Sequence, residues 1–208
     1  VDLLLGVSDD FSGHTDFSMF SRIDHAMVSD ILASEREFGA TASALSDNAY
    51  VSAVLFWQTS VRLGGAALTL DELVGAMEDA NILDERRSGV SQDTVRRMAR
   101  NAMARSELDR ATKGEGPGAA VLLSSMKGVS ARDSEISSSD VVTVPAFVEV
   151  ITRLAHARYA RTNSALSHCV RRTFKDHIVP LLGMNKATAS RKGLARYVEV
   201  LHLQRAMQ

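Results

Sequence analysis

Apolar side chains recur every three to four positions along most of the chain, and this spacing predicts helices rather than strands. The predicted helical stretches are 17–32, 51–61, 70–77, 95–103, 147–155, 165–182 and 194–201. Glycines at 64, 65 and 183 are expected to end the second and the sixth of these, and Pro180 should distort the last turn of the sixth. Residues 39–48 and 112–140 are small, polar and weakly periodic, which predicts a short loop and a long one.

Two of these helices follow the same local sequence, which predicts an internal repeat. Residues 68–77 (LTLDELVGAM) align with residues 142–151 (VTVPAFVEVI), with apolar side chains at matching positions. In each copy an extended apolar residue precedes a threonine N-cap and an amphipathic helix, and another helix comes before it. Glu72, three residues after Thr69, predicts a capping box in the first copy. The repeated unit is therefore helix–loop–helix.

This arrangement resembles a pair of EF-hands, in which aliphatic residues at loop position 8 pair across a short two-stranded ladder. A working calcium loop needs oxygen ligands at positions 1, 3 and 5, glycine at 6 and glutamate at 12. With Leu68 and Val142 at position 8, these positions hold Val61, Leu63, Gly65, Ala66 and Glu72 in the first copy and Glu135, Ser137, Ser139, Asp140 and Ala146 in the second. Neither set closes around a hard cation, so we expect no calcium. The sequence offers no other recognised metal or cofactor motif, so we expect no other metal and no cofactor.

Two stretches are similar to a known family. Residues 73–84 (LVGAMEDANILD) and 147–159 (FVEVITRLAHARY) resemble segments of the tubulin-polymerisation-promoting proteins and related EF-hand-like proteins of cilia and flagella. The likeness covers about residues 50–182. It implies an all-α fold and a non-catalytic role on microtubules, although the 112–140 loop is longer than the family pattern and both ends of the chain lie outside it.

The expected fold is all-α, with paired degenerate EF-hand-like units and flanking helices at both ends. We divide the chain into an acidic N-terminal helical extension (1–48), the EF-hand-like pair with its long loop (49–182) and a basic C-terminal helix (183–208). The chain begins at Val1 rather than methionine, and we expect it to be part of a longer protein.

Charge is distributed unevenly, although the 208 residues carry a net charge of only -1. Residues 1–60 hold nine acidic and two basic side chains, whereas residues 152–208 hold eleven basic and two acidic ones. Either the two halves attract each other, or the basic half binds an acidic partner. The candidate partner-binding residues are Arg153, Arg158, Arg161, Arg171, Arg172, Lys175, Arg191, Lys192 and Arg196.

Other candidate chemistry has a plainer interpretation. His14, Asp16, Asp24 and His25 match no metal-ligand spacing. Cys169 lies on an apolar stripe and is interpreted as a buried thiol. It is the single cysteine, so no internal disulfide can form, which favours a reducing compartment. No nucleophile elbow, phosphate loop, dinucleotide fingerprint or zinc-protease motif is present, so we expect no enzyme. No apolar run is long enough to cross a membrane.

The leading hypothesis is a calcium-independent structural or adaptor protein of the microtubule cytoskeleton, located in the cytoplasm, in a cilium or flagellum. Its partner would be tubulin or another acidic protein surface. Only Tyr159 and Tyr197 interleave with the basic residues, which argues against nucleic-acid binding by base stacking. The alternative is a signalling adaptor that binds an amphipathic peptide in an apolar cleft lined by Trp57, Met98 and Met103.

Overall fold

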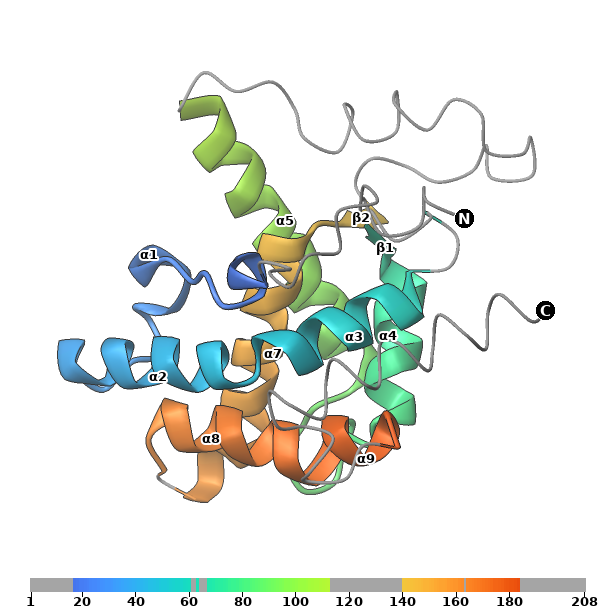
Figure 1. The fold of residues 1–208 in the computed structure, drawn as a ribbon. Coiled ribbons are helices and arrows are strands. Elements are labelled where there is room, and N and C mark those ends of the chain that lie inside the picture. The colour runs from blue at the N-terminus through green and yellow to red at the C-terminus, as the bar shows by residue number, and fades with distance from the viewer. Residues whose placement is uncertain (1–16, 61–62, 64–66, 113–139, 163, 184–208) are drawn as a thin grey trace, which may run out of the picture.

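A computed structural model describes residues 17–60, 63, 67–112, 140–162 and 164–183, and these residues are mostly helical (Figure 1). The α-helices are α1 (His25–Val28), α2 (Glu35–Asp47), α3 (Ala49–Thr59), α4 (Leu70–Asp79), α5 (Gln92–Thr112), α7 (Val144–Tyr159), α8 (Leu166–Thr173) and α9 (Val179–Leu181). The remaining elements are the 3₁₀ helices η2 (Ser18–Phe20) and η4 (Ala160–Thr162), the π-helical η5 (Phe174–Ile178), and the strands β1 (Leu68–Thr69) and β2 (Val141–Val142). The all-α prediction is confirmed for this part of the chain. No helix in it combines the length and apolar content needed to cross a membrane.

The two aligned stretches of sequence pair with each other in a small antiparallel sheet. Leu68 of β1 faces Val142 of β2, and Thr69 faces Val141. Leu68 and Val142 are completely buried. Each strand leads directly into a helix, β1 into α4 and β2 into α7, so the pairing holds the start of both helices in one place. The register of the sheet thus places Leu68 opposite Val142, the two residues that the alignment of 68–77 with 142–151 puts at the same position.

The two helix starts are built differently despite the shared threonine. Thr69 Oγ1 accepts a hydrogen bond from the Glu72 amide at 3.2 Å, and Glu72 Oε2 accepts one from the Thr69 amide at 2.8 Å, which is the predicted capping box. Before α7, the buried Thr143 Oγ1 makes no hydrogen bond to any described residue. Ala146 stands where Glu72 stands in the first copy, so a reciprocal cap cannot form there.

The prediction of a loop at 39–48 is wrong, because these residues belong to α2. Thr41, Ala44 and Leu45 are buried, and α2 packs along α8. Because many side chains of α2 are small, its apolar stripe is weak in the sequence. The same small side chains let α2 approach α8 closely, so that the stripe is buried between the two helices. Tertiary packing therefore determines α2 more than its own periodicity does.

The single helix expected over 17–32 is instead divided into η2 and α1. Asp24 interrupts it with an extended backbone (φ −89°, ψ 142°) and occupies the N-cap position of α1. The helix expected over 51–61 is α3, which ends at Thr59 rather than at Gly64 and Gly65, two positions outside the described residues. The hydroxyls of Thr59 and Ser60 donate to carbonyls of the last turn, and such bonds compete with helix continuation.

The predicted distortion before Pro180 is present. The Val179 amide bonds to the Phe174 carbonyl five residues earlier, which makes η5 a single π-helical stretch between α8 and α9. Proline lacks an amide hydrogen and crowds the carbonyl four residues before it, so the helix widens rather than continuing regularly. Gly183 follows with φ 63°, a left-handed conformation that suits the end of a helix.

One hydrophobic core joins these elements. Aromatic rings connect its parts: Phe56 of α3 lies 5.2 Å from Phe147 of α7 and 5.6 Å from Phe20 of η2. Residues of the predicted N-terminal extension, including Phe20, Val28 and Leu45, are therefore in the same core as the predicted pair of units. In Figure 1, α5 and α7 lie side by side, and α8 runs below α2. The π-helical η5, which continues α8, contacts α3. Residues 113–139 of the predicted long loop and 184–208 of the predicted C-terminal helix lie outside the described part.

Candidate functional site

The structure divides the predicted basic residues into two groups. Arg153 and Arg158 are engaged in ion pairs that join distant parts of the chain. The other described members are exposed, namely Arg161, Arg171, Arg172 and Lys175. Arg191, Lys192 and Arg196 lie outside the described residues. Of the six described positions, two are therefore engaged within the fold and four are exposed.

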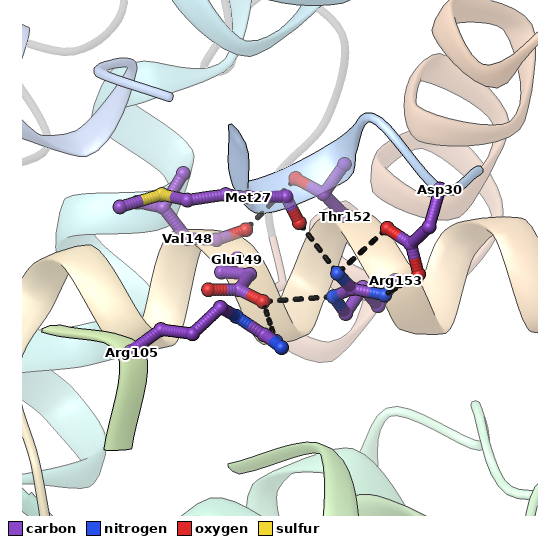
Figure 2. A network of polar contacts seen from close by, with 7 residues as sticks. All are labelled: Met27, Asp30, Arg105, Val148, Glu149, Thr152 and Arg153. Atoms are coloured by element: carbon purple, nitrogen blue, oxygen red, sulfur yellow. Dashed lines mark hydrogen bonds and ion pairs between the residues drawn. The ribbon is translucent and has the colours of Figure 1, made fainter. Parts of the chain in front are cut away.

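Arg153 is the centre of a polar network between α1 and α7 (Figure 2). Its Nε donates to Glu149 Oε1 at 2.8 Å, and its two terminal nitrogens donate to the carboxylate of Asp30 at 2.9 Å. One of them also donates to the Met27 carbonyl at 2.6 Å. The hydrogen bond from Arg153 lowers the pKa of Asp30 below its usual range. This network ties the acidic N-terminal part to the basic half of the chain.

Glu149 is the buried partner in this network, with 1% of its side chain exposed. Its Oε1 accepts hydrogen bonds from both Arg153 and Arg105 of α5. Its Oε2 and the Nε of Arg105 are buried without a hydrogen-bond partner among the described residues. A buried carboxylate is tolerated because two guanidinium groups face it. The network therefore joins three helices, α1, α5 and α7.

Arg158 has a similar structural role at the other end of α7. It binds Asp84, the first residue of a turn closed by a bridge between Asp84 and Val90. Hydrogen bonds from Arg158 and from the Arg87 amide lower the pKa of Asp84. Arg158 thus fixes the turn that connects α4 to α5, and its charge is neutralised within the fold.

Three of the exposed basic residues, Arg171, Arg172 and Lys175, lie on the outer side of α8 and η5, whereas Arg161 belongs to η4. His168, Arg171, Arg172 and Lys175 line a shallow hollow there with Asp176, while the opposite side of the same helix is buried in the core. This alternation follows from the amphipathic sequence of α8, whose apolar residues point toward α2 and α7. We call these four residues the α8 basic face.

The ion pairs on the α8 basic face are weak. Arg171 lies 3.5 Å from Asp47 and Arg172 lies 3.2 Å from Asp176, with both arginine side chains about half exposed (49% and 50%). The Arg172 guanidinium also stacks over the Tyr159 ring, 4.6 Å from its centroid. Exposed pairs of this kind contribute about 0–1 kcal/mol, so a carboxylate-rich ligand can replace them at little cost. The hollow suits an anionic group.

Cys169 does not contribute a nucleophile to this face. Its side chain is buried on the inner side of α8, where the thiol donates to the Ser164 carbonyl at 3.6 Å. Burial raises the pKa of the thiol above its ordinary value. The interpretation of Cys169 as a buried thiol is confirmed, and the group is poorly suited to form a thiolate.

Sequence reasoning missed His177. Its Nε2 lies 3.1 Å from the Tyr159 hydroxyl and its Nδ1 lies 3.1 Å from the Ala80 carbonyl, so it links η5, α7 and the end of α4. Burial lowers the pKa of the imidazole below its ordinary value. The residue lies on a helical stripe beside Ile178, and nothing local in the sequence identifies contacts so far away along the chain.

The residues considered for a metal cluster and for a peptide-binding cleft pack against neighbouring side chains wherever the structure describes them. His25 packs edge-on against Phe38, while His14 and Asp16 lie outside the described residues. Within the described ranges, no three histidine, cysteine, aspartate or glutamate side chains gather as a metal site would require. Of the three residues expected around a cleft, Met103 is buried, and Met98 and Trp57 are half-buried against the core.

Comparisons with known proteins give no relative: no family model, no curated protein and no solved structure matches this chain.

Proposed function

We propose that this protein is a non-catalytic, calcium-independent adaptor of the microtubule cytoskeleton, cytoplasmic and located in a cilium or flagellum. In this proposal it consists of two degenerate EF-hand-like units and binds an acidic protein surface, such as that of tubulin, through the α8 basic face. The observation that carries the proposal is the exposed cluster of Arg171, Arg172 and Lys175 around a hollow, held by surface pairs that an acidic ligand can displace.

Two features support the EF-hand-like part of the proposal. The pairing of Leu68 with Val142 joins the two helix–loop–helix stretches at equivalent positions, as a pair of EF-hands would be joined. The carboxylate of Glu72, the last acidic residue left at a ligand position of the first loop, bonds to Thr69 of the capping box. A building block whose shape is fixed by a cap and a core has no need of a calcium switch.

Co-sedimentation with microtubules tests the proposal. We expect the full chain to appear in the pellet at low salt and to be partly released at moderate salt, because contacts between exposed charges are screened over about 10 Å at 0.1 M. The double variant Arg171→Glu, Lys175→Glu should lose most of this binding. Microtubules stripped of their acidic tails should also bind less of the unaltered chain.

The matched control is Arg97→Glu, Arg100→Glu, which makes the same change in net charge on exposed residues of α5. We expect this control to sediment like the unaltered chain. Absence of the unaltered chain from the pellet at both salt concentrations would exclude tubulin as the partner. An equal loss in both double variants would show that net charge, not the α8 basic face, determines binding.

A further inference from the structure

Arg172 of the α8 basic face contacts two groups at once. Its Nε donates to Asp176 Oδ2 at 3.2 Å, and its guanidinium lies over the Tyr159 ring, 4.6 Å from the centroid. Arg172 and Asp176 both line the hollow, and the Arg172 side chain is about half exposed. Tyr159, in contrast, is buried. Arg172 therefore connects the solvent side of α8 with the interior of the fold.

The chain of contacts continues inward from Tyr159 to His177. The Tyr159 hydroxyl lies 3.1 Å from Nε2 of His177, and Nδ1 of the same ring lies 3.1 Å from the Ala80 carbonyl. In the neutral ring Nδ1 donates to this carbonyl and Nε2 accepts from the tyrosine hydroxyl. A second proton on Nε2 would reverse the latter bond, with the tyrosine oxygen as the acceptor. The contacts of His177 therefore accommodate both charge states of the ring.

The charges that face His177 belong to α7, α8 and η5. Burial lowers the pKa of His177 most, and Arg158 and Arg172 lower it further, whereas the hydrogen bond to the α4 carbonyl and the charge of Asp176 raise it. Helix α3, which also contacts η5, has no charged side chain. Arg158 is already paired with Asp84. Of the charged groups that face His177, Arg172 and Asp176 are those that line the hollow.

An anionic group in the hollow changes this balance in one direction. A carboxylate that pairs with Arg172 offsets a positive charge that opposes the second proton on His177. A ligand that displaces Asp176 from Arg172 also leaves the charge of that carboxylate uncompensated beside the imidazole. Both changes favour the doubly protonated ring. Because coupling between two sites is reciprocal, a proton on His177 then favours the anionic ligand by the same factor.

We propose that binding of an acidic protein segment to the α8 basic face is coupled to the uptake of one proton by His177, so that the partner binds more tightly in mild acid. The coupling passes through Arg172, the member of the face that lies over Tyr159. The proton comes from the solvent and is released to it when the partner dissociates. This regulation rests on the proposed function, because it acts on the ligand of the same basic face.

The test measures binding of a labelled peptide of about ten aspartates to the full chain, by anisotropy of the label between pH 8 and pH 5.5. It compares the unaltered chain with His177→Gln, which keeps a donor for Ala80 and an acceptor for Tyr159. At pH 8 we expect equal binding, because His177 is neutral there. Between pH 8 and pH 5.5 the affinity of the unaltered chain should gain about threefold more than that of the variant. The peptide and His168 are the same in both proteins, so their contributions cancel.

Two arginines of the α8 basic face provide a matched control. Arg171→Gln and Arg172→Gln each remove one half-exposed cation, but of the two only Arg172 lies over Tyr159. We expect both substitutions to weaken binding and only Arg172→Gln to remove the extra gain in acid.

A second measurement follows the unaltered chain directly. In an NMR titration of the imidazole signals, His177 should take up its proton at a higher pH with the peptide bound than without it. This result does not depend on the folding of any variant.

Three results would overturn the coupling. Equal pH dependence in the unaltered chain and His177→Gln, together with an NMR titration that the peptide does not shift, would do so while leaving the α8 basic face as a binding site. Loss of the extra gain in both arginine variants would show that overall charge, and not the contact with Tyr159, connects the two sites. No peptide binding at either pH would overturn the α8 basic face as an anion site, and the coupling with it.

Discussion

His177 is a half-buried titratable side chain that connects three elements. A carbonyl oxygen only accepts hydrogen bonds, so Nδ1 must carry the proton that is donated to Ala80. In the neutral ring Nε2 then accepts from the Tyr159 hydroxyl. A second proton would have to enter a desolvated site that also faces Arg158 and Arg172, with Asp176 giving only partial compensation. This is why the pKa of the folded state is lowered.

We expect this residue to make stability fall in mild acid. Well above pH 6.5, the ordinary pKa of an imidazole, His177 is neutral in both the folded and the unfolded state and adds no pH dependence. As pH falls below 6.5 the unfolded chain takes up the proton first, so the free energy of unfolding decreases until the folded pKa is reached. Urea unfolding of the unaltered chain and of His177→Gln between pH 5 and pH 8 measures this.

Glutamine can still donate to Ala80 and accept from Tyr159, so the variant should fold. The difference between the two proteins cancels the contributions of the other histidines. We expect the unaltered chain to lose more stability than His177→Gln on going from pH 7 to pH 5. Parallel curves for the two proteins would mean that His177 titrates equally in the folded and unfolded states.

At the scale of elements, the same threonine has opposite environments in the two copies of the repeat. Thr69 uses its hydroxyl in a capping box, whereas Thr143 buries a hydroxyl that has no hydrogen-bond partner among the described residues. Satisfied caps stabilise a helix start, while an unsatisfied buried hydroxyl costs free energy. Equal substitutions at these two positions should therefore have unequal effects.

The substitution is threonine to valine, which keeps the shape and the preference for an extended backbone. Thr69→Val should lower the free energy of unfolding by about 1 kcal/mol, because the amide of Glu72 loses its acceptor. Thr143→Val should leave stability unchanged or raise it slightly. Urea unfolding of both variants provides the comparison. A similar loss at both positions would imply that Thr143 has a hydrogen-bond partner in solution.

The sequence predicted the elements whose signals are local. The capping box at Thr69 and the distortion before Pro180 need only a few neighbouring residues, and both are present. The repeat aligned Leu68 with Val142, the EF-hand resemblance implied that these two residues pair, and the structure shows that pairing. Helix α2 was missed because its stability comes from contact with α8, more than a hundred residues away in the chain. The same reason applies to His177, whose partner Ala80 is distant in sequence.

At the scale of the whole molecule, the uneven charge of the sequence is partly used inside the fold. Arg153 and Arg171 both pair with aspartates of the N-terminal part, Asp30 and Asp47. Sequence analysis left open whether the two halves attract each other or the basic half binds a partner. In the described structure both pairs join the halves, yet their burial differs: 14% of the Arg153 side chain is exposed and 49% of the Arg171 side chain.

This difference predicts unequal costs for the same substitution. Arg153→Met leaves buried Glu149 with one guanidinium instead of two and removes the donor to Met27, so we expect a loss of about 2–3 kcal/mol. Arg171→Met removes one exposed pair and should change stability by less than about 0.5 kcal/mol. Urea unfolding at 0.05 M and 0.5 M salt separates the two, since screening weakens exposed pairs much more than buried ones. The Arg153 effect should persist at high salt. Equal losses of stability in both variants, seen only at low salt, would contradict this prediction. They would mean that unspecific attraction between opposite charges holds the two halves together, and that Arg153 is as available to an external partner as Arg171.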